Sequence, residues 1–228
     1  MSQKPEWLNL SFAEAVEWFR QKINIPTEKW DEIDAAAREK AFTVAGMTKA
    51  EMLDDARLLV ERQLTEGNSY DDFQKQWKRL IGRQGWKSKG NQDRRIYIIA
   101  DTNVRKAYSA GKRLQYESAG LQDRMPYKVW RWRDSPVPRP NHKALHNKAI
   151  LASDPFWDAV GDLPCGFGCR CQSFYANEQT LKLLGATILA SPPDPDTIVD
   201  KGFGGNVSNK ELIKLTKSRV SPEIAKKM

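Results

Sequence analysis

Apolar side chains recur every three or four positions through the first 81 residues, which is the spacing of amphipathic helices. Two capping boxes, in which serine or threonine is followed three positions later by glutamate, begin at Ser11 and Thr48. Pro26 and Gly46 are helix-ending residues, and Ser69 is a further N-cap. This pattern predicts four helices, over residues 11–23, 27–42, 48–66 and 69–81.

The pattern changes after residue 81. Residues 82–90 (GRQGWKSKG) are rich in glycine and positive charge, which indicates a loop and the best position for a domain boundary. The loop lacks the Gly-x-x-x-x-Gly-Lys-Ser/Thr order of a phosphate-binding loop. Apolar positions return at helical spacing from Asp93 to Ser118 and stop before Gly120, so the longest helix is expected there.

Strict alternation of residue types over Tyr127–Arg133 predicts a strand, with Lys128 and Trp130 on one face. The stretch Ser135–Pro140 is expected to be a rigid turn, because proline fixes φ and cannot donate to a sheet ladder. Loops and short strands are expected from there to Phe174.

The last quarter of the chain divides into three segments. Residues 178–189 favour a short helix, whereas residues 191–196 and 202–205 are rich in proline and glycine and predict an extended arm. Residues 209–227 are amphipathic and basic. They are either a docking helix for another subunit or a frayed terminus.

Together these elements predict an α+β protein that is mainly α-helical. We expect a helical N-terminal region over residues 1–90, a smaller loop-rich core module over residues 91–176 and a C-terminal arm over residues 177–228. The core module would combine the long helix, a short antiparallel sheet and the loops that contain the histidines and cysteines.

The composition agrees with a folded protein, since 40% of the 228 residues are hydrophobic and 29% are charged. No run approaches the roughly 18 apolar residues that a membrane span needs. The first ten residues also lack the basic and apolar regions of a signal peptide. We therefore expect a soluble protein that is made in the cytoplasm and has no membrane-spanning segment.

Positive charge is concentrated in the middle of the chain. The formal net charge is +8, with −3 over residues 1–80, +11 over residues 81–150 and zero over residues 151–228. Such a block suits nucleic acid or an acidic protein partner, because phosphate binding needs clustered Lys and Arg. A solvated helix face is the alternative. The candidate binding residues on the long helix are Arg94, Arg95, Arg105, Lys106, Lys112 and Arg113.

The candidate chemistry lies in the histidines and cysteines. His142 and His146 are the only two histidines, and Cys165, Cys169 and Cys171 are the only cysteines. Three clustered cysteines exclude a disulfide scaffold, but these residue types are zinc ligands, and a structural zinc ion is the candidate cofactor. The spacing matches no zinc-ribbon or zinc-finger pattern, so reduced thiols packed under a glycine turn are the alternative.

Six short segments between residues 11 and 171 resemble, in order, the Mu F-type phage head morphogenesis proteins, also called the minor head protein family. The most specific are Arg139-Pro-Asn-His142 and Gly166-Phe-Gly-Cys-Arg-Cys171. The six segments are residues 11–20, 42–46, 101–111, 139–142, 151–157 and 166–171. The motif residues are Arg139, His142, Asp154, Trp157, Cys169, Arg170 and Cys171.

The resemblance implies a non-enzymatic structural protein of the virion. Such a protein would be present in few copies in the head, near the portal vertex, after assembly in the host cytoplasm. Its partners would be the portal protein and other head proteins, and phage double-stranded DNA is a further candidate partner. Its role would be in head morphogenesis and in genome packaging or ejection.

This chain departs from the family pattern at two places. His146-Asn147 replaces an acidic residue and glycine, and Cys165 replaces an asparagine. Only His142, Cys169 and Cys171 match the motif, so the resemblance does not imply a four-ligand site. Polar contacts or a metal between these loops would cross-link and stabilise a module that has little regular core.

The sequence is also compatible with two other functions. One is a metal-dependent nuclease that uses His142, His146 and the basic strand, which a plasmid-cleavage assay with His142→Ala as control would reveal. The other is a DNA-binding accessory protein outside the virion, which would show strong and salt-sensitive binding by the isolated protein.

Overall fold

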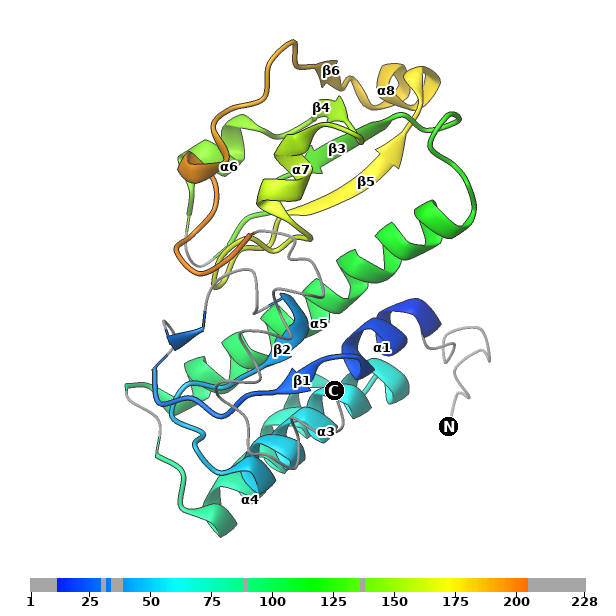
Figure 1. The fold of residues 1–228 in the computed structure, drawn as a ribbon. Helices are drawn as coiled ribbons and strands as arrows, with labels where there is room; N and C mark the ends of the chain where they lie inside the picture. The colour runs from blue at the N-terminus through cyan, green and yellow to red at the C-terminus, as the bar shows by residue number, and fades with distance from the viewer. Residues whose placement is uncertain (1–11, 30–31, 34–38, 88–89, 136–137, 205–228) are drawn as a thin grey trace, which may run out of the picture.

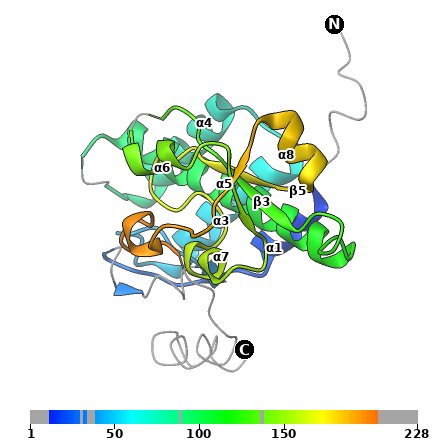
Figure 2. The same ribbon diagram turned by 90° about the horizontal axis from the view of Figure 1, so that it is seen from above.

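The computed structural model describes residues 12–29, 32–33, 39–87, 90–135 and 138–204. It confirms an α+β fold that is mainly helical (Figure 1). A helical unit lies on one side of the long helix α5 (Gln92–Ser118), and a sheet module lies on the other. Viewed from above, the strands of the sheet module lie over α5 (Figure 2). No helix among the described residues is long and apolar enough to cross a membrane.

The helical unit consists of α1 (Ala13–Arg20), α3 (Ala50–Glu66) and α4 (Tyr70–Gln84), which pack against α5. Its core is built around the fully buried side chains of Phe19, Leu53 and Trp77. Helix α1 approaches α5 closely at Gly111, where a β-carbon would lie 2.8 Å from the backbone nitrogen of Ala15. A glycine is therefore required at this crossing.

The predicted helix ends are partly confirmed. The Ser69 side chain accepts a hydrogen bond from the backbone of Asp72, and Gly67 ends α3 in the left-handed conformation. The Thr48 capping box is wrong, because Lys49 is the N-cap of α3 and no side chain caps it. Ser11 lies outside the described residues.

The helix predicted over residues 27–42 is wrong at both of its ends. Phe42 lies in β2 (Ala41–Phe42), which pairs in parallel with β1 (Ile23–Asn24), and Thr27 forms an isolated bridge to Met47. Ile23 therefore also lies outside the first helix, which ends at Arg20. Tertiary packing overrides the helical spacing of this region. Phe42 is fully buried, and its ring centroid lies 5.7 Å from that of Phe19.

The long helix is confirmed with small shifts in its bounds. Helix α5 has 27 residues and begins at the N-cap Asn91, whose side chain accepts from the backbone of Arg94. The preceding loop is shorter than predicted, because α4 continues through Gly82 and ends at Gln84.

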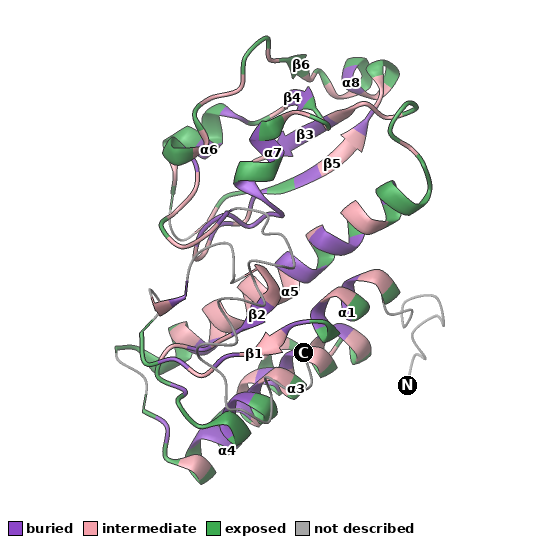
Figure 3. Cartoon of the chain, in the orientation of Figure 1, coloured by how far each residue is buried: buried purple, intermediate pink, exposed green. Residues whose placement is uncertain are grey.

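The sheet module contains four strands in the order β5-β3-β4-β6. They are β3 (Tyr127–Arg131), β4 (Lys148–Leu151), β5 (Gln172–Ala176) and β6 (Thr187–Ile188). Strand β3 pairs antiparallel with β4 and β5, but β4 pairs in parallel with β6, so the predicted antiparallel sheet is in fact mixed. Strand β3 is central and buried on both faces, as Figure 3 shows.

Short helices surround this sheet. Two of them, α6 (Pro140–Ala144) and α7 (Pro155–Val160), lie where loops and short strands were predicted, whereas α8 (Glu178–Leu184) lies within a predicted helix. Prolines occupy the first turns of α6 and α7, where the missing backbone N–H costs nothing. The helix predicted over residues 178–189 ends early, at Leu184, because Gly185 caps it in the left-handed conformation, and Thr187–Ile188 form β6.

The described part of the C-terminal arm returns to the sheet module. After a single 3-10 turn at Pro195–Thr197, the backbone N–H of Asp200 donates to the carbonyl of Cys165 at 3.0 Å. We call residues 194–204 the strap. The segment predicted to be amphipathic, residues 209–227, lies outside the described residues.

Candidate metal centre

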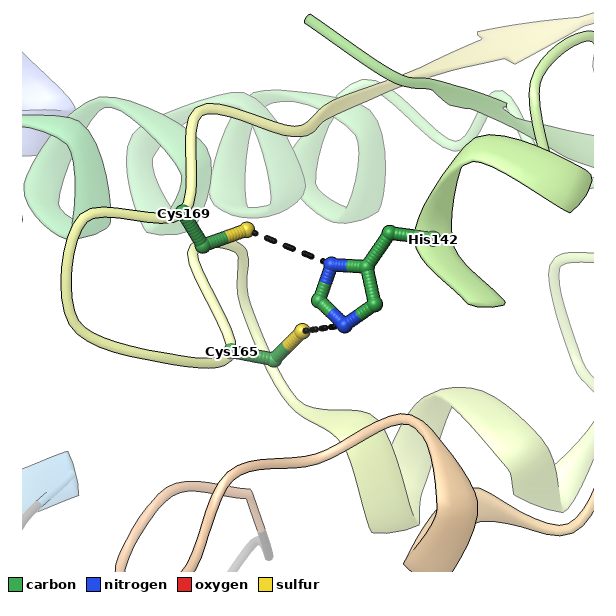
Figure 4. A group of neighbouring side chains, drawn as sticks. All are labelled: His142, Cys165 and Cys169. Carbon is green, nitrogen blue, oxygen red and sulfur yellow. Dashed lines mark hydrogen bonds between the residues drawn. The ribbon is translucent and has the colours of Figure 1, made fainter. Parts of the chain in front are cut away.

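His142 and the three cysteines meet in the interior of the sheet module. His142 lies on α6, and Cys165, Cys169 and Cys171 lie on the loop that joins α7 to β5. All four side chains are buried, with His142 only 1% exposed. Figure 4 shows the imidazole ring between Cys165 and Cys169. Two segments more than 20 residues apart thus supply one cluster.

The two nitrogens of the His142 ring have different partners. Nε2 lies 2.7 Å from the carbonyl oxygen of Ile198 on the strap, and this oxygen can only accept. The proton of a neutral ring is therefore on Nε2. Nδ1 consequently presents a lone pair, and it lies 3.6 Å from Sγ of both Cys169 and Cys171.

These distances match those between the ligands of a tetrahedral metal. Bond lengths of about 2.1 Å to nitrogen and 2.3 Å to sulfur give a nitrogen–sulfur separation of about 3.6 Å in a tetrahedral zinc site. Cys165 lies on the other side of the ring, with Sγ 3.9 Å from Nε2. Ligand atoms of His142, Cys165 and Cys169 all lie within 4.8 Å of one another, so the cluster could hold a metal ion.

The thiols also differ in their electrostatics. Hydrogen bonds from Cys165 and Cys171 lower the pKa of Cys169 well below its usual range. The same contacts, together with burial, raise the pKa of Cys165 and of Cys171. The cluster thus favours one thiolate at Cys169, which is the form that ligates metals.

His146 lies apart from this cluster. Its side chain is exposed, and its ring lies edge-on to Trp132 with the centroids 6.5 Å apart. The two histidines that the sequence suggested as ligands therefore do not meet at one site.

The other motif residues support the cluster. The guanidinium of Arg139 donates to the Asp200 carboxylate and, at 3.0 Å, to the carbonyl of Phe167. Asp154 caps α7 by accepting from the backbone of Phe156 at 2.8 Å. Trp157 stacks on Trp130. Arg170 donates a hydrogen bond to the hydroxyl of Tyr97 on α5.

Most of the basic residues predicted to bind a partner have contacts within the protein. Lys106 is buried, where it pairs with Glu39 and donates to the carbonyl of Asp162 at 2.6 Å. Arg113 pairs with the Asp162 carboxylate at 3.1 Å. Arg105 pairs with Asp101, and Arg95 donates to the carbonyl of Ala45. Arg94 and Lys112 are exposed.

Sequence reasoning missed the residues that complete these networks. Ile198 lies 56 positions after its partner His142, and Asp200 lies 61 positions after its partner Arg139, and no local pattern marks either residue. Asp162 is only 4% exposed and joins Lys106 and Arg113 to the sheet module. A lone aspartate in a loop carries no sequence signal of such a role.

The chain is similar in sequence to known phage and prophage proteins. Residues 54–174 match the family model described as "Phage Mu protein F like protein". The chain is 30% identical over 210 residues to the "Mu-like prophage FluMu F protein" of Haemophilus influenzae, covering 86% of this chain and 49% of that protein. It is 32% identical over 193 residues to the "Putative capsid assembly protein F" of Escherichia phage Mu, covering 77% and 42%.

The chain thus spans about half the length of these relatives or less. No solved structure matches it. The matched residues 54–174 include His142 and all three cysteines, whereas Ile198 and Asp200 lie beyond them.

Proposed function

Because the chain belongs to the phage Mu protein F like family, we propose that it is a minor head protein that acts at the portal vertex during head morphogenesis. The observation that carries this proposal is its similarity to a protein named as a capsid assembly protein, over 77% of this chain. The proposed partners are the portal protein and other head proteins. The protein would be made in the host cytoplasm, enter the virion head and assist genome packaging or ejection.

The buried cluster supports a structural rather than catalytic role. His142 is 1% exposed, and its Nε2 is bonded to the strap. A general base must reach a substrate or a water molecule, and this ring is enclosed by the core of the sheet module. We therefore propose no enzymatic activity.

Co-assembly tests the proposed head function. The full chain, carrying an affinity tag, would be co-expressed with the portal and major capsid proteins of the same phage. Recovery of the portal protein with the tagged chain is the expected result, and the matched control is the portal protein without the tagged chain. Absence of any head protein from the purified material, at native expression levels, would reject the proposal.

We also propose that the cluster holds a structural zinc ion. His142 Nδ1 and the thiolates of Cys169 and Cys171 would provide three ligands, and Cys165 would provide the fourth after turning its sulfur toward Cys169. Four protein ligands leave no open position for substrate, which is typical of zinc that stabilises a fold. Zinc would replace part of the missing core of a small, loop-rich module.

Metal analysis of the purified full chain tests the zinc proposal. One zinc per chain is expected, and Cys169→Ser should abolish stoichiometric binding. Cys165→Ser should weaken binding less, because its sulfur lies on the Nε2 side of the ring. His146→Ala is the matched control and should retain one zinc. Less than a tenth of a zinc per chain, after purification with zinc present, would contradict the proposal.

A further inference from the structure

The strap is held by the Arg-Pro-Asn-His motif. Nδ2 of Asn141 donates to the carbonyl of Thr197, and Nε2 of His142 lies 2.7 Å from the carbonyl of Ile198. Arg139 completes this set by donating to the carboxylate of Asp200. Three of the four motif residues therefore bind consecutive parts of the strap.

The loop that supplies the cysteines also contacts the strap. The carbonyl of Cys165 accepts from the backbone N–H of Asp200. A β-carbon at Gly166 would overlap the Asp200 carboxylate, so this glycine permits the close approach. A β-carbon at Gly204 would lie 2.6 Å from the carbonyl oxygen of Ala159. The strap is thus fitted closely to the module along its length.

The strap also closes the core around the cluster. Ile198 is 3% exposed and packs in the same hydrophobic cluster as Trp130 and the three cysteines. Its side chain and its carbonyl oxygen therefore contact the site by separate interactions, one apolar and one polar.

We infer that docking of the strap is coupled to metal binding through the His142 ring. This inference rests on the zinc site proposed above. A metal on Nδ1 withdraws electron density from the ring and makes the Nε2–H a stronger donor to the carbonyl of Ile198. Conversely, that carbonyl fixes the tautomer and orientation in which Nδ1 faces Cys169 and Cys171. Because linkage is reciprocal, each event must favour the other by the same factor.

Hydrogen exchange of the full chain, with zinc bound and after chelation, tests the coupling in one direction. The reporter is the amide of Asp200, which donates to the carbonyl of Cys165 in the docked strap. Chelation should speed its exchange by about tenfold or more, as expected for an outer-shell contact. Amides in α3, on the far side of α5, serve as the internal control and should not change.

The zinc affinity of strap variants tests the other direction. Ile198→Ala should weaken zinc binding by about tenfold, although Ile198 provides no ligand. Leu189→Ala is the matched control, because Leu189 packs on the same cluster but precedes the strap. If Ile198→Ala fails to fold, Asp200→Asn replaces it, since this change removes only the charge that pairs with Arg139.

The two proposals fail in different ways. Stoichiometric zinc with equal strap protection in both states would overturn the coupling and leave the zinc site intact. Unchanged zinc affinity in a folded strap variant would overturn it as well. Absence of zinc from the purified chain would overturn both proposals.

Discussion

Nε2 of His142 lies 2.7 Å from the carbonyl oxygen of Ile198, a residue 56 positions further along the chain. This bond ties the family motif to a segment beyond the matched residues 54–174. It also fixes the tautomer in which the other ring nitrogen faces two thiols. The motif histidine therefore joins two segments of the sheet module that lie far apart in the sequence.

His142→Ala should lower the free energy of unfolding of the sheet module by about 3–5 kcal/mol. The substitution leaves a cavity in a buried site and removes the partner of the Ile198 carbonyl. Thermal melting followed by tryptophan fluorescence would measure the change, since Trp130 lies next to this ring. His146→Ala is the control, and its exposed side chain should contribute within about 0.5 kcal/mol. Equal melting temperatures for the two variants would contradict this role.

Two glycine substitutions should change stability in opposite directions. Gly111→Ala should destabilise by about 1–3 kcal/mol, because its β-carbon would press on the backbone of α1 at Ala15. Gly82→Ala should stabilise by about 0.5–1 kcal/mol, since it lies inside α4 with open space around it. Urea denaturation would measure both. A stabilising Gly111→Ala would show that α1 does not approach α5 this closely.

DNA binding, if the protein contacts the packaged genome, should depend on the exposed cations of α5. Removing one cation that binds a phosphate lowers the slope of log affinity against log salt by about 0.9. Arg94→Ala combined with Lys112→Ala should therefore lower this slope by up to about 1.8. Lys75→Ala is the control for a general decrease in positive charge, because Lys75 is an exposed residue of α4. An unchanged slope in the double variant would exclude this surface.

Lys106 shows why the charge pattern alone could not identify that surface. On the sequence it belongs to the same basic series as Arg94 and Lys112. In the fold it is buried beside Glu39 and the carbonyl of Asp162. Helical spacing gives the direction of a side chain but not what packs over it, so its burial depends on tertiary contacts.

Local sequence patterns likewise predict single helices and strands, but not which distant segments meet in the sheet or at the site. Helix α5 and strand β3 have strong local patterns, and both were predicted within a few residues. The parallel pairing of Ile23 with Ala41 was not predicted, because nothing in either segment specifies its partner. Likewise, the sequence suggested His142 as a candidate ligand, but the strap contact depends on a long-range return of the chain.

Lys22 should make stability depend on pH above neutrality. Its side chain is 8% exposed and donates to the carbonyl of Glu39 at 2.7 Å. Burial lowers the pKa of Lys22 from 10.5 to about 7; the charges of Glu39 and Asp162 oppose this shift and that of Lys106 adds to it. Between pH 7 and about 10.5 the unfolded chain therefore binds one more proton than the folded chain. Stability must rise with pH in that window and level off below it.

The measurement is the free energy of unfolding of the protein relative to Lys22→Met at pH 7 and pH 9. The difference should shift by about 2 kcal/mol in favour of the protein that retains Lys22, because deprotonation relieves the buried charge. Comparison with the variant removes the titration of the cysteines, which both proteins share. A pH-independent difference would mean that Lys22 keeps an ordinary pKa and that the contacts with Glu39 and the ring of Trp18 compensate for its burial.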